Sequence, residues 1–188
     1  MNAQVKVKMT YAEYLAREAT AEVKHDFIAG EVFAMAGGSI EHGALGLAVA
    51  AELRTALTGK PCRVLNSDVR VHVRSTGASF YPDVSVVCGK LETSPDDADA
   101  VTNPIVLVEV LSESTEAYDR GAKAAHYRRF ESLKEYVLVS QTERRVEVQR
   151  RNERNIWELH FFGAGERIEL SSLGVSFPVD AVYANPLA

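Results

Sequence analysis

A single acidic residue inside an apolar strand constrains this chain most. Residues 105–111 read as a β-strand whose members are apolar except for Glu109. Side chains alternate between the two faces of a strand, and an apolar run on both faces is typical of a central strand that is covered on both sides. An ionised carboxylate there loses hydration worth several kcal/mol unless a partner replaces it. We therefore expect a cation, a hydrogen-bond donor or a metal ion beside Glu109.

A second acidic residue stands at the start of an earlier strand. Residues 81–88 read as a strand that begins Tyr-Pro-Asp, and alternation places Asp83 on the same face as Ser85 and Val87. If the two strands are neighbours, the carboxylates of Asp83 and Glu109 can converge on one metal ion. Mg²⁺ is typically held by one or two carboxylates, while waters and substrate phosphates complete its shell.

A helix is expected from about Glu116 to Phe130, directly after the strand that holds Glu109. Lys123 and Tyr127 lie four residues apart, so they share one face of this helix, and that face can look back over the carboxylates. A lysine there would offer its ammonium to a phosphate oxygen and help to orient a water nucleophile. A metal ion beside it would lower the pKa of bound water. These residue types fit metal-dependent hydrolysis of a phosphodiester.

The composition is that of an ordinary globular protein. The chain has 188 residues, of which 46% are apolar and 25% charged, and we expect one domain over 1–188. Its net charge of −5 argues against a constitutive nucleic-acid binder, although it permits an enzyme that meets phosphates at a local patch. The sequence shows no apolar run of membrane-spanning length and no signal-peptide core in residues 1–10, so we expect a cytoplasmic protein without a membrane partner.

The two cysteines, Cys62 and Cys88, have neither metal-ligand spacing nor a disulfide framework around them. We interpret both as small buried hydrophobic residues in or beside strands. Neither lies in a suggestive neighbourhood, and no nucleophile-elbow motif is present, so an unrelated serine or cysteine hydrolase is disfavoured.

The remaining pattern predicts an α+β fold. A capping box at Thr10 and Glu13 begins a short helix, and Ser39 is the expected N-cap of a longer one that ends near Thr58. Residues 91–102 read as a surface loop. The expected strands are a hairpin over 23–36, three candidates at 62–65, 68–74 and 80–88, and a C-terminal meander over 135–140, 145–151 and 155–162. The core order α-β-β-β-α-β predicts a mixed, twisted sheet flanked by helices.

Several of these segments, taken in order, resemble a known nuclease superfamily. They are Tyr81-Pro82-Asp83-Val84, then Asn103-Pro104 leading into Val108-Glu109-Val110-Leu111-Ser112, then Ser114-Thr115 with Asp119, Lys123 and Tyr127, besides the Gly30-Glu31 hairpin and the strand at 135–139. The superfamily is that of the PD-(D/E)XK nucleases. Within it, almost the whole chain is similar to the Uma-two family of restriction endonucleases, a bacterial domain of unknown function.

The resemblance implies a restriction-endonuclease-like fold and a metal-dependent endonuclease that cuts DNA with a metal-activated water. Asp83 and Glu109 would be the ligands of Mg²⁺ or Mn²⁺. The superfamily places its lysine two residues after the second acid, where this chain has Leu111. The Uma-like pattern instead supplies Lys123 from the following helix. Cutting both strands of a duplex is easiest with two sites, so a homodimer is expected.

A second hypothesis remains open beside the enzyme. The chain could keep the nuclease fold as a catalytically inactive module for nucleic-acid binding or assembly, since a lysine that has moved also fits an inactive relative. Further residues could support the site around its ligands, each with a plain surface or packing role as the alternative: Glu31, His42, Glu52, Asp68 and Tyr127.

Overall fold

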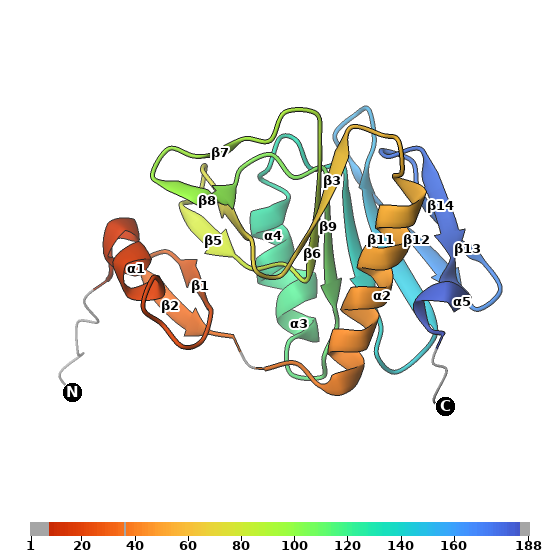
Figure 1. Cartoon of the computed structure of the whole chain (residues 1–188), viewed down its shortest axis with the longest axis horizontal. Helices are drawn as coiled ribbons and strands as arrows, with labels where there is room; N and C mark the ends of the chain where they lie inside the picture. The colour runs from red at the N-terminus through yellow and green to blue at the C-terminus, as the bar shows by residue number, and fades with distance from the viewer. Residues whose placement is uncertain (1–7, 36, 185–188) are drawn as a thin grey trace.

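The computed structural model describes residues 8–35 and 37–184 of the chain (Figure 1). Within them, the strands form two six-stranded sheets and one two-stranded sheet. Figure 1 shows the N-terminal helix and hairpin at one end of the molecule and the two-stranded sheet at the other, with the central sheet and its helices between them. This is the predicted α+β fold, with mixed sheets flanked by helices.

The central sheet has the strand order β12-β11-β10-β9-β6-β3. In it β9 and β10 run parallel, and every other neighbouring pair is antiparallel. A parallel pair needs a crossover connection, which is why a helix lies between these two strands. The six strands are β3 (Cys62–Asn66), β6 (Val84–Cys88), β9 (Val106–Val110), β10 (Glu135–Val139), β11 (Arg145–Arg151) and β12 (Trp157–Gly163).

Both faces of β9 are covered, as its sequence predicts, and all its residues are buried. The three valines at 106, 108 and 110 share a core with Leu45, Val49 and Leu53 of α2 (Ile40–Ala56). On the other face, Leu107 packs in a second core with Tyr127. The helix that carries Tyr127 has three consecutive parts, α3 (Glu116–Tyr118), the π-helical η1 (Asp119–Lys123) and α4 (Ala124–Tyr127).

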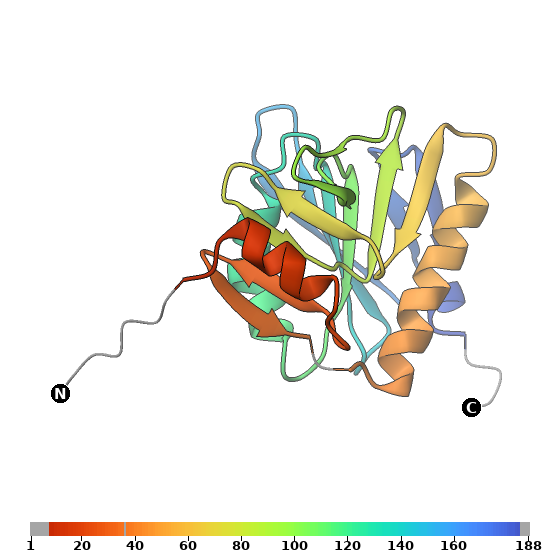
Figure 2. The same cartoon turned by 60° about the vertical axis from the view of Figure 1, so that its left-hand side comes forward.

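The N-terminal sheet has the strand order β2-β1-β5-β4-β8-β7. Figure 2 shows α1 (Tyr11–Glu18) and the β1–β2 hairpin in front of the helix η1–α4, away from α2. The expected loop over 91–102 is wrong, because it contains two strands and buries Ala100 and Val101. The six strands are β1 (His25–Ile28), β2 (Glu31–Ala34), β4 (Arg70–Val73), β5 (Ala78–Phe80), β7 (Thr93–Ser94) and β8 (Asp97–Val101).

The predicted N-terminal caps of two helices are confirmed. Thr10 and Glu13 form the capping box of α1, and the Ser39 hydroxyl accepts a hydrogen bond of 3.0 Å from the backbone N–H of His42. The hairpin turns where predicted, with Ala29 and Gly30 at φ of 52° and 88°. Two consecutive left-handed residues are what a two-residue hairpin turn requires.

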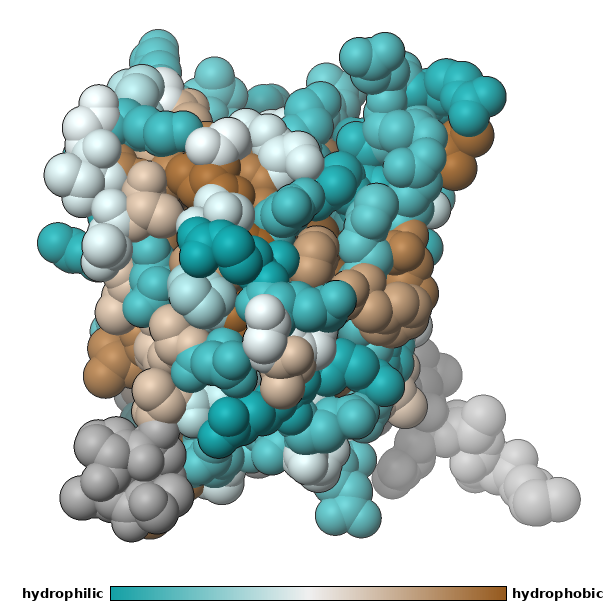
Figure 3. Space-filling view, turned by 90° about the vertical axis from the view of Figure 1, so that its right-hand side faces the viewer, coloured by the Kyte–Doolittle hydropathy of each residue, from teal (hydrophilic) through white to brown (hydrophobic). Residues whose placement is uncertain are grey.

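The C-terminal part adds β13 (Arg167–Leu170), β14 (Val175–Pro178) and α5 (Val179–Val182). Their apolar side chains, among them Ile168 and Phe177, belong to the same core as α2. Figure 3 shows this side of the molecule, where hydrophilic residues dominate and apolar ones form small separate groups. No helix in the described part of the chain is long and apolar enough to cross a membrane.

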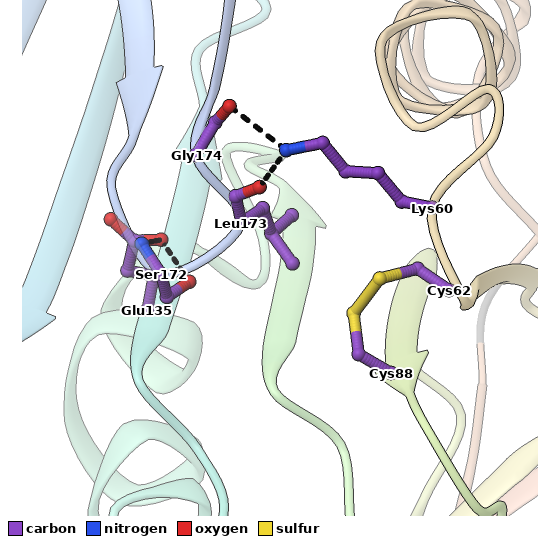
Figure 4. The surroundings of a disulfide bond; sticks show 7 residues. All are labelled: Lys60, Cys62, Cys88, Glu135, Ser172, Leu173 and Gly174. Carbon is purple, nitrogen blue, oxygen red and sulfur yellow. Dashed lines mark hydrogen bonds between the residues drawn. A yellow bond between two sulfur atoms is a disulfide. The ribbon is translucent and has the colours of Figure 1, made fainter.

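The two cysteines lie in strands as predicted, but their interpretation as plain hydrophobic residues without a disulfide is wrong. Cys62 and Cys88 stand directly opposite each other in the antiparallel pair β3–β6, and a disulfide joins them (Figure 4). Strand register brings them together, although they are 26 positions apart in the sequence. Close by, the Lys60 ammonium donates to the carbonyls of Leu173 and Gly174, which ties the start of β3 to the loop before β14.

Reduction of this disulfide should lower the free energy of unfolding by about 3 kcal/mol, because it releases a closed loop of roughly 27 residues in the unfolded chain. Denaturant unfolding of the oxidised and the reduced protein would measure the difference. Cys62→Ser is the matched control, and its stability should not respond to reductant. Equal stabilities for oxidised and reduced wild type would contradict the expectation.

Candidate active site

Register places the two predicted acids side by side. In the antiparallel pair β6–β9, Val84 lies opposite Val108, so Asp83 at the entry to β6 stands opposite Glu109. The Asp83 Oδ2 accepts a hydrogen bond of 2.7 Å from the backbone N–H of Val110. The two strands are therefore neighbours, as the sequence argument required. The Glu109 carboxylate contacts η1 and α4, and the Asp83 carboxylate contacts His42 of α2.

Glu109 has the partners that its burial demands. Its side chain is 5% exposed, and its Oε1 lies 2.7 Å from Nζ of Lys123. The Tyr127 hydroxyl donates a second hydrogen bond of 2.7 Å to the same oxygen. Both partners come from the helix that follows β9, so the predicted meeting of Glu109, Lys123 and Tyr127 is confirmed.

The helix that follows β9 contains a π-helical segment. Residues 119–123 form η1 between α3 and α4, and both Asp119 and Lys123 are buried there. The Lys123 ammonium lies 3.4 Å from Oδ1 of Asp119 as well as in contact with Glu109. π-helical turns inside α-helices are frequently found at functional sites. Helical spacing places Asp119 or Arg120 on the same face as Lys123, and the structure shows that Asp119 is the one beside the ammonium.

Burial and the ammonium of Lys123 are the main influences on the pKa values in the cluster. Burial raises the pKa of Glu109 to about 8, although Lys123 acts to lower it. Burial would lower the pKa of Lys123, but the carboxylates of Glu109, Asp26 and Asp119 outweigh this effect and raise it. Lys123 is therefore a charged ammonium throughout the physiological range.

Asp26 is a site residue that the sequence analysis missed. It lies in β1, is 6% exposed, and its Oδ1 accepts a hydrogen bond of 3.3 Å from the backbone N–H of Tyr81. Burial raises the pKa of Asp26 to about 6, against the lowering effect of Lys123. An acid beside the apolar Phe27 and Ile28 was a signal in the sequence. Nothing local showed that β1 would reach the Glu109 cluster.

His42 approaches the site from the first turn of α2. Its Nε2 lies 3.3 Å from Oδ2 of Asp83, and this hydrogen bond raises the pKa of His42. Gly38 makes room for the ring, because a Cβ at that position would lie 2.8 Å from Nδ1 of His42. The imidazole therefore links α2 to Asp83. The sequence analysis names His42 among the residues that could support the site.

The other three supporting candidates do not meet the cluster. Glu31 begins β2 beside the hairpin turn, opposite Ile28. Glu52 lies ten residues beyond His42 on α2, about 15 Å along the helix axis. Asp68 is exposed and pairs with the ammonium of Lys24 at 2.6 Å. None of the contacts described for these residues involves Asp83 or Glu109.

An open cleft of about 580 Å³ leads to Asp83. Its walls come from the segment around Lys24, from Met35 near the end of the hairpin, from the N-terminal half of α2 and from the turn after β3. Gly37 to Ser39 line it at the start of α2, where backbone N–H groups point outward and favour anions. The cleft thus offers an approach for an anionic group toward Asp83 and His42.

The donor set fits a divalent cation. Glu109 and Asp119 contact the buried ammonium of Lys123, while the charges of Asp26 and Asp83 act on Lys123 and Glu109 respectively, so carboxyl groups outnumber the cation in this part of the described chain. One oxygen each of Asp83 and Glu109, Oδ1 and Oε2, accepts no hydrogen bond from the described residues. In the described ranges no three acidic, histidine or cysteine side chains are arranged to enclose a metal ion. Two carboxylates with waters and substrate phosphates would complete the shell, which suits Mg²⁺.

Comparisons with known proteins identify the family of the chain. Residues 11–180 match the model of the Uma2 family, described as "Putative restriction endonuclease". The chain belongs to the Uma2 family. Two uncharacterized proteins from Synechocystis sp. are 36% and 33% identical over 176 and 168 residues. These matches cover 94% and 89% of this chain and 92% and 95% of the respective relatives.

A solved structure supports the fold. The crystal structure of a putative nuclease belonging to DUF820 from Anabaena variabilis superposes with a TM-score of 0.74, covering 91% of this chain and 95% of that one. Its sequence identity is 15%, so the likeness concerns the fold. The predicted family and the restriction-endonuclease-like fold are therefore confirmed.

Lys123→Met should destabilise the protein in a pH-dependent way. Removing the ammonium leaves the buried Glu109 without its cation, which costs about 3 kcal/mol where the wild-type carboxyl is ionised, above about pH 8. Burial raises the pKa of Glu109 to about 8, and loss of the ammonium raises it further. Wild type and variant therefore both carry a proton on folded Glu109 between about pH 5 and 7, and the variant loses further stability relative to wild type as pH rises above about 8. Urea unfolding should show a larger loss at about pH 9 than at about pH 6.

Lys24→Met is the matched control for this experiment. The Lys24 side chain is 38% exposed and pairs with an exposed carboxylate, so its loss should change stability by less than about 1 kcal/mol. A loss for Lys123→Met that is the same at both pH values would show that Glu109 does not depend on the ammonium.

Proposed function

We propose that this protein is an endonuclease that hydrolyses phosphodiester bonds in DNA with Mg²⁺ or Mn²⁺. The observation that carries the proposal is the pairing of Asp83 and Glu109 across β6 and β9, with the buried ammonium of Lys123 on Glu109. The open cleft beside Asp83 provides access for a phosphate, and family membership supports a nuclease.

In this proposal Asp83 and Glu109 hold the metal ion through the oxygens that accept no hydrogen bond from the described residues. When bound, the ion would lower the pKa of a coordinated water and stabilise negative charge on the phosphoryl oxygens. Lys123 favours the ionised form of Glu109, whereas burial favours the protonated form and raises its pKa to about 8. Tyr127 fixes the orientation of the same carboxylate by its hydrogen bond.

The cleft supplies the contacts for the substrate. His42 and the backbone N–H of Val110 hold Asp83 from two sides, so its remaining oxygen keeps one direction. Lys24 and the start of α2 at Ser39 lie on the cleft wall, where they can meet phosphates on either side of the scissile one. A local site of this kind is compatible with the overall charge of −5. We further propose a cytoplasmic location and a homodimer with two such sites.

Cleavage of supercoiled plasmid should require added Mg²⁺ or Mn²⁺ and should stop with chelator. Asp83→Asn and Glu109→Gln should each lower the rate at least about 100-fold, because each removes one anionic ligand. Asp99→Asn is the matched control, since that exposed acid lies in β8, outside the cluster and outside the cleft lining, and should leave the rate unchanged. Circular dichroism would establish that all three variants are folded.

The same assay decides between the two hypotheses. If folded wild type neither cuts DNA or RNA nor binds Mg²⁺ or Mn²⁺ by calorimetry, the catalytic proposal fails. The catalytically inactive module would then be the better account, with the Lys123–Glu109 pair as a structural ion pair.

His42→Ala should weaken metal affinity or activity by about 10–100-fold, the usual effect of removing a residue that orients a ligand. The reason is that Asp83 Oδ2 would lose its contact with Nε2, which leaves the carboxylate free to rotate. Glu52→Gln on the same helix is the control and should behave as wild type. Calorimetric titration with Mn²⁺ would measure the affinity directly. Unchanged affinity in His42→Ala would remove His42 from the site.

A further inference from the structure

The central sheet ends in a long strand whose outer side is open. Among the described strands, β12 pairs with β11 alone and is the last strand of the sheet. It runs over seven residues, Trp157–Gly163, and contains neither proline nor lysine. Proline and lysine in an edge strand normally protect it from pairing with another chain. β12 lacks this protection.

The backbone groups that face outward can be assigned from the ladder. The N–H of Asn152 bonds to the carbonyl of Ile156, which starts the alternation of the β11–β12 pair. By that alternation, Glu158, His160 and Phe162 direct their backbone groups at β11. The N–H and C=O groups of Trp157, Leu159 and Phe161 therefore point away from the sheet. The outward N–H of Gly163 is already taken by the Glu166 carboxylate at 2.6 Å.

The side chains on this edge are those of an interface. Leu159 and Phe161 are 52% and 55% exposed, and they share one face of the strand with Trp157. Arginines surround them, with Arg151 4.8 Å from the Trp157 ring and Arg145 5.8 Å from the Phe161 ring. Aromatic and arginine side chains are enriched at the centres of protein interfaces.

We propose that β12 pairs antiparallel with β12 of a second copy of this chain, around a two-fold axis at Leu159. In this register Leu159 meets its own counterpart, and Trp157 meets Phe161. All the outward N–H and C=O groups of these three residues then bond across the axis. A shift by two residues one way would bring the occupied N–H of Gly163 into the ladder. A shift the other way would set Phe161 opposite Asn155, whose N–H already bonds to the carbonyl of Asn152. The register centred on Leu159 is therefore favoured.

The opposite face of the strand is complementary to itself in the same register. Glu158 falls opposite His160 of the second copy, and His160 falls opposite its Glu158. Within one chain, Nε2 of His160 is a buried atom without a hydrogen-bond partner among the described residues, and it lies 4.0 Å from the Glu158 carboxylate, whose Oε1 accepts from Asn152. Polar pairs across neighbouring strands stabilise a sheet. An unrelated chain would match both faces of β12 only by coincidence. The partner at this edge is therefore a second copy of the same chain.

The proposed interface leaves the candidate active site open. β12 lies three strands from β9, at the edge opposite β3. Joining two central sheets in this way separates the two β9 strands by seven strand spacings, about 34 Å. Both clefts beside Asp83 stay accessible, and the dimer does not depend on the proposed nuclease function.

Light scattering after size exclusion tests the oligomer. The full chain has a mass of 20.6 kDa, and we expect twice that mass. Because residue 159 faces itself, Leu159→Glu and Leu159→Lys should each be monomeric through repulsion of like charges. An equimolar mixture of the two should form dimers again. Phe161→Glu mixed with Phe161→Lys should stay monomeric, because Phe161 faces Trp157 and not itself.

Three outcomes would overturn the proposal. A monomeric wild type means that no second copy occupies the edge. Dimers in both folded Leu159 variants place the interface elsewhere, and Leu47→Arg on the exposed side of α2 would then test that alternative surface. Failure of the mixed Leu159 variants to pair, with both folded by circular dichroism, rejects the register centred on Leu159.

Discussion

The buried ion pair of Glu109 and Lys123 is the interaction on which the rest of the site depends. A carboxylate in the middle of a doubly covered strand has no access to water, so its charge survives only with a cation and a donor in contact. The helix over 116–127 meets both needs at once, since Lys123 and Tyr127 reach the same oxygen of Glu109. The docking of that helix and the ionisation of Glu109 therefore stabilise each other.

Three parts of the fold meet at the site, and each contributes polar groups to it. The N-terminal sheet brings Asp26, α2 brings His42, and the crossover helix brings Lys123 with Asp119 and Tyr127. Asp83 lies among them because the pair β6–β9 sets it opposite Glu109. The apolar faces of β9 pack closely against these layers and so fix their positions. The polar groups of the site are therefore held in place by the cores that lie beneath them.

Alternation along strands and the period of a helix made part of the site predictable from sequence. They place Asp83 and Glu109 on defined strand faces and set Lys123 and Tyr127 on one face of the helix that directly follows Glu109. Asp26 did not follow, since its position depends on the pairing of β1 with β5, which joins residues more than fifty positions apart. The disulfide did not follow either, because the register of β3 and β6 sets it and the local sequence around each cysteine gives no sign of that register.

The place of the lysine shows what the chemistry constrains. In the superfamily that the sequence resembles, lysine follows the acid by two positions on the same strand, whereas here that position is Leu111, buried in the core with Tyr127. What the carboxylate needs is an ammonium within contact distance, and a helix that crosses back over the strand supplies one as well as the strand itself does. The ammonium then depends on tertiary packing. In this chain, loosening of the crossover helix would remove the cation, the tyrosine and the apolar cover of Glu109 together.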